Sequence, residues 1–97
     1  MPLDPSLLVL ISLAGGAKHG HAMMLDIERI SGTRPGPGTL YGAIGRLESN
    51  GLIEPLPVEA RRRPYRLTAA GESVLSERLA QLRAAVEIGL RRATSNQ

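Results

Sequence analysis

The sequence predicts a mainly α protein with a small two-stranded β ribbon and a long C-terminal helix. Apolar residues recur at helical spacing in four segments, and only one short region alternates as strands do. The 97 residues are enough for one modest core. Aromatic residues make up only 2% of the chain, so we expect this core to be aliphatic.

The first helix is predicted to start at Asp4-Pro5, where an N-cap acceptor precedes a proline at the first helical position. The residues that follow are apolar nearly all round. A helix of that kind is buried on more than one side, which in so small a chain points to a second subunit. The predicted dimer-interface residues of this helix are Leu7, Leu10 and Ile11.

The second helix is predicted to open over 18–21 and to close at Gly32. Met23, Ile27 and Ile30 are spaced i, i+4, i+7 and form its buried face. A short polar connection leads to the next helix. Two helices joined by a tight turn rich in glycine and proline are typical of a helix-turn-helix pair.

A third helix is predicted over 37–50, since proline suits its first position and Asn50-Gly51 ends it. Its buried face consists of Leu40, Ala43, Ile44 and Leu47. Its opposite face carries Thr39, Gly42, Gly45, Arg46 and Ser49. Two glycines and one arginine leave that face with little bulk, so its backbone can approach another molecule closely.

A two-stranded ribbon is predicted to follow. Residues 52–56 form an edge strand because they contain Pro55, and residues 65–67 alternate as the returning strand. The wing between them, 57–64, is expected to be a flexible basic loop. It holds three consecutive arginines, Arg61, Arg62 and Arg63.

The last helix is predicted from about Ala69 to Ala93, with Thr68 as its cap. Its apolar residues form a heptad seam, and its far half extends beyond the small core, so a partner should cover it. The predicted interface residues are Leu75, Leu79, Leu82, Val86 and Leu90. Glu87 and Arg91 are expected to pair on its surface.

In order, these elements predict a winged helix-turn-helix over residues 1–70 and a C-terminal dimerisation helix with a tail over 71–97. A helix fits the DNA major groove, and a basic ribbon tip reaches phosphates or the minor groove. The net charge of +3 agrees with an anionic partner such as double-stranded DNA. The candidate DNA-binding residues are Lys18, His19, Thr39, Tyr41, Gly42, Arg46, Arg61, Arg62 and Arg63.

Other classes are not expected. The chain has no cysteine, and His19 and His21 lack an obvious third ligand, so we predict no metal site. Without a Walker motif or a Ser-His-Asp pattern, we expect neither enzyme activity nor a cofactor. The apolar run 7–14 is too short to span a bilayer and follows no basic segment, which favours a cytoplasmic protein without membrane contact.

Three runs resemble the PadR family of transcriptional regulators, in that family's order: HGHAMMLDIERISG, PGTLYGAIGRLESNGLI and RRRPYRLTAAGE. The resemblance implies a homodimeric DNA-binding regulator, usually a repressor. It implies that the C-terminal helix packs with the partner's first helix, and that a small-molecule effector binds at the dimer interface.

The sequence departs from the family pattern where Gly36 replaces a serine cap and where Gly42 and Gly45 replace bulkier residues. Fewer side chains then remain to distinguish bases, and more of the recognition falls to phosphate contacts and DNA shape. Arg46 could contact a base, pair with the nearby Glu48 or contact a phosphate, and Thr39 could contact a phosphate or satisfy backbone N–H groups. Tyr41 is expected to be half-buried with its hydroxyl at a phosphate, and the alternative is a purely core position. The glycines also leave open a winged-helix protein-interaction module without DNA binding, which the arginine triplet argues against.

Overall fold

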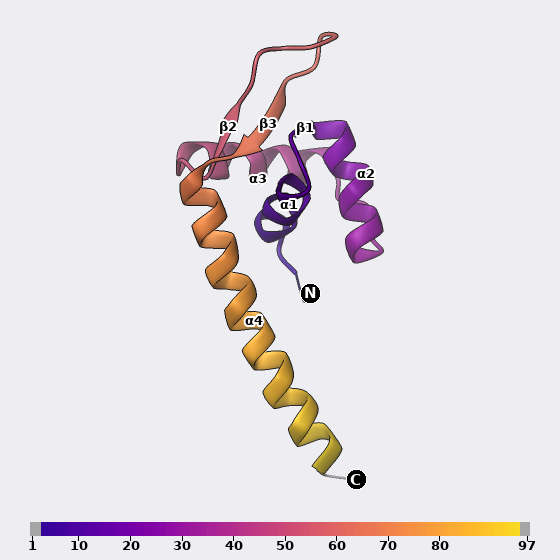
Figure 1. Ribbon diagram of the computed structural model, residues 1–97. Coiled ribbons are helices and arrows are strands. Elements are labelled where there is room, and N and C mark those ends of the chain that lie inside the picture. Colours follow the sequence, from indigo (N-terminus) through magenta and orange to yellow (C-terminus); the bar gives the residue numbers. More distant parts are fainter. Residues whose placement is uncertain (1–2, 96–97) are drawn as a thin grey trace.

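The computed structural model describes residues 3–95, which form four helices and a small sheet. In chain order the elements are α1 (Pro5–Ala14), β1 (Lys18–His19), α2 (Gly20–Ser31), α3 (Pro37–Ser49), β2 (Ile53–Pro55), β3 (Pro64–Leu67) and α4 (Ala69–Ser95). In Figure 1, α1 lies at the centre between α2 and α4, and the β2–β3 hairpin projects beyond α3. The predicted class is confirmed: a mainly α fold with a β wing and a long C-terminal helix.

The sheet has one strand more than the predicted ribbon. It is antiparallel with strand order β1-β3-β2, and β1 pairs Lys18 with Tyr65 and His19 with Pro64. These two residues were expected to open the second helix. They are extended instead because β3 offers them a partner strand from a distant part of the chain, which local periodicity does not reveal.

The core lies around α1, which contacts all three other helices. Residues 7–10 are each at most 5% exposed, because α2, α3 and α4 of the same chain surround this helix. Leu7 and Leu10, predicted in a dimer interface, are each only 1% exposed. They have no surface left for a partner, whereas Ile11 remains half-buried.

Polar contacts fix the helices that flank α1. The buried Ser12 hydroxyl donates to Asp26 Oδ2 at 2.7 Å and so joins α1 to α2. This hydrogen bond, with the nearby charges of Lys18 and Arg29, lowers the pKa of the Asp26 carboxyl. At the start of α1, Asp4 accepts from the backbone N–H of Leu7 at 2.8 Å, as the predicted N-cap should.

The start of α4 is part of the core. Thr68 Oγ1 accepts from the Gly71 N–H at 3.0 Å and donates to the Gly51 carbonyl at 2.6 Å, so the predicted cap also ties α4 to the end of α3. Gly71 is buried directly against Leu52, where a β-carbon would collide with the backbone. Leu75 is 6% exposed and, like Leu7, lies inside the protomer rather than at its surface.

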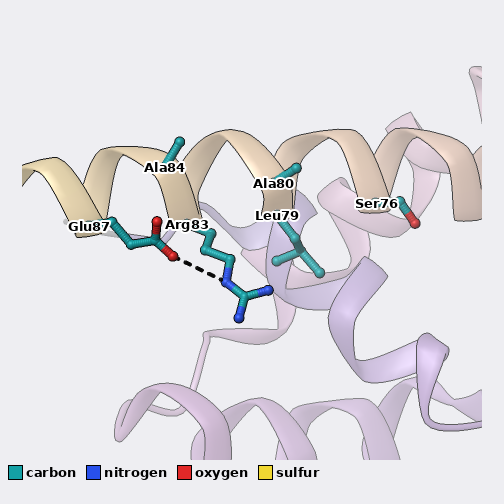
Figure 2. Close-up of a pocket in the computed structure, with 6 residues that line it drawn as sticks. All are labelled: Ser76, Leu79, Ala80, Arg83, Ala84 and Glu87. Atoms are coloured by element: carbon teal, nitrogen blue, oxygen red, sulfur yellow. Dashed lines mark ion pairs between the residues drawn. The ribbon is translucent and has the colours of Figure 1, made fainter.

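Beyond Leu75 the helix leaves the core, and the molecule reaches 55 Å along its longest axis. The apolar residues of this half stay exposed: Leu79 41%, Leu82 38%, Val86 56%, Ile88 41% and Leu90 63%. Figure 2 shows Leu79, Arg83 and Glu87 along one side of α4. Glu87 pairs with Arg83 at 3.5 Å rather than with the predicted Arg91, since arginines lie one turn away on either side.

Candidate nucleic-acid interface

The exposed face of α3 agrees with the sequence pattern. Leu40, Ala43, Ile44 and Leu47 are buried. Thr39, Gly45 and Arg46 are exposed on the other side. A β-carbon built on Gly42 would lie 3.4 Å from Arg46 Nη1, so the missing side chain gives the guanidinium room to lie along the helix. Gly45 faces open space, which leaves the backbone accessible there.

The two ends of α3 are fixed differently. Gly36 is the N-cap and provides no side-chain hydrogen bond to the first turn. At the other end, Gly51 adopts the left-handed conformation at φ +72°, and the Leu52 N–H donates to the Leu47 carbonyl at 3.0 Å. The start of α3 therefore has no side-chain cap, whereas a backbone hydrogen bond closes its end.

Tyr41 connects α3 to α2. Its ring lies against the backbone of Gly20, the first residue of α2, and its side chain remains exposed. The absence of a side chain at Gly20 thus leaves room for the Tyr41 ring and hydroxyl at the surface. A contact between this hydroxyl and a phosphate stays a prediction.

The wing tip is an ordered tight turn, which corrects the expectation of a flexible loop. Glu59 and Arg62 exchange both backbone hydrogen bonds at 2.8 Å. The two residues between them, Ala60 and Arg61, have positive φ values of 48° and 66°. Turns with positive φ at both central positions match the twist of a β-hairpin, although neither residue is the glycine or asparagine that usually stands there.

Each wing arginine has different surroundings. Arg63 Nη1 donates to the Leu56 carbonyl at 2.8 Å and supports the base of the wing. Arg62 Nη1 lies 3.2 Å from Nε2 of His19. Arg61 has no hydrogen bond or ion pair to any other residue within 3–95, and its guanidinium is available to an anion.

His19 lies between α2 and the wing. Its Nδ1 accepts from the Ala22 backbone N–H at 3.3 Å and caps α2, while its Nε2 faces Arg62. A neutral imidazole accepts at only one ring nitrogen, so the two contacts compete. Arg62 is therefore weakly held by the protein and can turn to a phosphate at little cost.

Lys18 is directed inward. Its ammonium group donates to the Ser12 carbonyl and to the Gly16 carbonyl at 3.1 Å, and lies 3.9 Å from Asp26. The Ser12 carbonyl lies in the last turn of α1 and the Gly16 carbonyl lies just beyond it, where cations are commonly stabilising. With two hydrogen bonds and one ion pair inside the protein, Lys18 supports the fold rather than facing a partner.

A hollow of about 330 Å³ brings the remaining groups together, and we call it the wing hollow. Its lining residues come from β1, α2, α3, the wing and β3: His19, Gly20, His21, Tyr41, Arg61, Arg62, Arg63 and Tyr65. Burial of the Tyr65 ring and the charge of Glu48 raise the pKa of its phenol. A concave surface of arginines and neutral donors suits a phosphate group.

Sequence reasoning did not select Gly20, His21 or Tyr65 for this surface. Tyr65 was interpreted only as part of an alternating strand, and His21 only as a weak metal ligand. The pairing of β1 with β3 places Tyr65 beside Lys18 and brings the α2 start under the wing. Only that long-range pairing could have identified them.

The described part of the chain contains neither a candidate metal site nor a candidate membrane-spanning helix. Residues 3–95 contain no group of three or more His, Cys, Asp or Glu side chains placed to hold a metal ion. Within the same residues, no helix combines the length and apolar character needed to cross a membrane.

The helix pair, the basic wing and the strand order define a winged helix-turn-helix protein. Residues 7–77 match the model of the Transcriptional regulator PadR-like family, and because this is well over half of the chain, the protein belongs to that family. It is accordingly grouped with transcriptional regulators, as the resemblance of its motifs implied.

Individual relatives agree with this assignment. A protein of Streptomyces fradiae, the uncharacterized 37.1 kDa protein in transposon TN4556, is 50% identical over 72 residues, which cover 74% of this chain and 21% of that protein. Transcriptional activator GvpE2 of Halobacterium salinarum is 35% identical over 72 residues, covering 74% of this chain and 36% of its own length. The chain thus spans well under half of either relative.

The fold has also been seen in solved structures. A transcriptional regulator from Clostridium thermocellum superimposes with a TM-score of 0.78 at 24% sequence identity, and the match covers 89% of both chains. At this identity the similarity concerns the fold alone.

Proposed function

We propose that this protein is a homodimeric DNA-binding transcriptional regulator that acts as a repressor in the cytoplasm. The observation that carries the proposal is the wing hollow, where arginines and tyrosines from separate elements converge beside the exposed face of α3. Such a surface is suited to a polyanion with regularly spaced phosphates. Residues 1–70 would bind DNA and residues 71–97 would hold two protomers together.

In this proposal α3 lies in the major groove and the wing lies on the phosphate backbone. Arg46 is the exposed cation of α3, and Gly42 and Gly45 allow the helix backbone close to the base edges. Thr39 and Tyr41 would donate to phosphates from the first turns. His19 would do so from the edge of the wing hollow, with Arg61, Arg62 and Arg63 beside it.

Dimerisation is supported by the exposed apolar residues in the outer half of α4. Leu79, Leu82, Val86 and Leu90 would each leave water on contact with a second copy, together with Ile11 of α1. A two-fold dimer presents two copies of α3, so its operator would be a pseudo-palindrome with half-sites about one helical turn, or a multiple of it, apart. A small-molecule effector would bind at this interface.

The experiment measures fluorescence anisotropy of a labelled random duplex at low salt, with wild type and the variant R61A/R62A/R63A. Wild type should bind and the variant should bind more weakly. The control R91A/R92A removes exposed arginines of α4 far from the wing hollow and should keep wild-type affinity. Absence of binding by wild type would instead favour the protein-interaction module, and footprinting on selected genomic fragments would reveal two-fold sites.

A further inference from the structure

A second concave surface lies on the opposite side of α1 from the long helix. It has a volume of about 480 Å³ and is formed where the start of α1, the end of α2 and the first turn of α3 meet. We call it the three-helix pocket. Pro5 and Leu8 line it from α1, Ile27 and Ile30 from α2, and Thr39 and Leu40 from α3. No residue of α4 or of the wing contributes to it.

The lining of this pocket is apolar and uncharged. None of the residues that form it carries an ionisable side chain. The Ser31 hydroxyl at its edge is already used, since it donates to the Ile27 carbonyl at 2.8 Å. The hydroxyls of Thr33 and Thr39 take part in none of the side-chain hydrogen bonds found within residues 3–95, so two polar groups remain free at the rim.

One apolar side chain is conspicuously uncovered at this place. Met23, Ile27 and Ile30 share one face of α2, and the first two are 0% and 2% exposed. Ile30 is 39% exposed because the protein does not fill the space in front of it. An apolar occupant would remove this surface from water, which is the main source of affinity in small-molecule sites.

We propose that the three-helix pocket binds an uncharged, mainly apolar small molecule with one or two hydrogen-bonding groups. The volume lies within the range of about 300–1,000 Å³ typical of such sites. A charged ligand would lose its hydration here without meeting an opposite charge, so the lining selects against it. The free hydroxyls of Thr33 and Thr39 provide its polar partners.

Occupancy would affect the DNA-contacting helix, and this part of the inference rests on the function proposed above. The pocket includes Gly36, which caps α3 without a side-chain hydrogen bond, and Thr39, a proposed phosphate contact. A ligand packed there touches the end of α3 that has no side-chain cap. Its affinity therefore differs between two states of the protein, one with α3 placed for DNA and one with α3 displaced. Such a difference in affinity is the requirement for coupling between the pocket and DNA binding.

The binding experiment uses the full chain without DNA and the neutral fluorescent probe N-phenyl-1-naphthylamine. Wild type should bind one probe per chain with saturable fluorescence enhancement, and ¹³C-methyl spectra should show shifts at Ile27, Ile30 and Leu40. I30D places a charge at the rim and should weaken binding at least tenfold. The matched control V58D changes an exposed valine of the wing and should bind as wild type does.

Three results would overturn the site: no saturable binding, equal binding by I30D with no methyl shifts in the pocket, or binding that appears only when L82E disrupts the dimer. The last result would mean that a second copy fills the pocket.

For coupling, saturating probe should change the affinity for random duplex at least threefold. Unchanged DNA affinity would disprove the coupling alone, whereas wild type that never binds DNA would disprove the proposed function.

Discussion

The ring of Tyr41 lies against the backbone of Gly20, so closely that a β-carbon at position 20 would be 2.7 Å from Tyr41 Cζ. The contact joins the first turn of α2 to the exposed face of α3 and sets one wall of the wing hollow. Gly20 is needed here for close approach and has no unusual backbone conformation, since its φ is not positive.

Gly20→Ala should therefore displace the tyrosine ring, and because the ring is the far end of an exposed side chain, the cost should stay below about 1 kcal/mol. In a Tyr41→Ala background the same change should cost little. Urea unfolding of the four proteins measures the coupling, and G38A, whose site is open, is the control. Costs that simply add within about 0.3 kcal/mol would show that the two residues do not constrain each other.

The turn at the wing tip should be improvable. Ala60 adopts a positive φ that disfavours a β-carbon by about 1–2 kcal/mol, so Ala60→Gly should raise the free energy of unfolding by about 1 kcal/mol. Ala80→Gly, in an exposed turn of α4, should lower it by about 1 kcal/mol. Thermal unfolding compares the two, and a lower midpoint for A60G would mean that the turn is not left-handed in solution.

The wing and α3 should differ in how salt and sequence affect them. Changing the three wing arginines to Ala should weaken specific and random duplexes alike and reduce the log–log salt slope by about one per lost phosphate contact. Arg46→Ala should cost about 1–3 kcal/mol on the operator and less on random DNA if it reads a base. Anisotropy across a salt series tests both, and equal losses for R46A on both duplexes would assign Arg46 to the backbone.

The outer half of α4 should control the oligomeric state. Replacing both Leu79 and Leu82 with Glu should give a folded monomer, because these side chains are about 40% exposed in the protomer and carry little of its core. The dimer would not form, because the two glutamate charges would be buried in its interface without partners. Light scattering at micromolar concentration decides it, and a wild-type mass near 10.4 kDa would refute the dimer.

Acid should weaken the α1–α2 junction. The Ser12 hydrogen bond and neighbouring positive charges lower the pKa of Asp26 in the folded chain below its unfolded value of about 4. The ionised carboxylate therefore stabilises the fold above that pH, and this contribution is lost as the pH falls through the folded pKa. Asp26→Asn should be less stable at neutral pH and show a flatter stability profile below pH 4, as measured by urea unfolding. An unchanged profile would mean that Asp26 is not preferentially ionised in the fold.

Local sequence was sufficient for the helices and for the exposed face of α3. Asp4-Pro5, the spacing of Leu40 to Leu47 and the Asn50-Gly51 stop each depend on residues within a few positions, and such short-range rules predict their own element well. The arginine triplet was likewise visible as composition. The predictions that depended on contacts between distant segments were wrong. Strand β1 was missed, and Leu7, Leu10 and Leu75 were assigned to a second subunit although the same chain covers them.

The sequence by itself determined a four-helix chain with a basic ribbon, a bare glycine-containing helix face and a family resemblance that the family model confirms. Only the tertiary structure decided which cations are available. Lys18 caps α1 and Arg63 supports the wing. Arg61 is free to bind an anion, and Arg62 contacts only His19, whose other ring nitrogen accepts from Ala22. The physical reason is that hydrogen bonds and burial depend on neighbours in space, and residues 18–20, 41 and 61–65 become neighbours only when β1 pairs with β3.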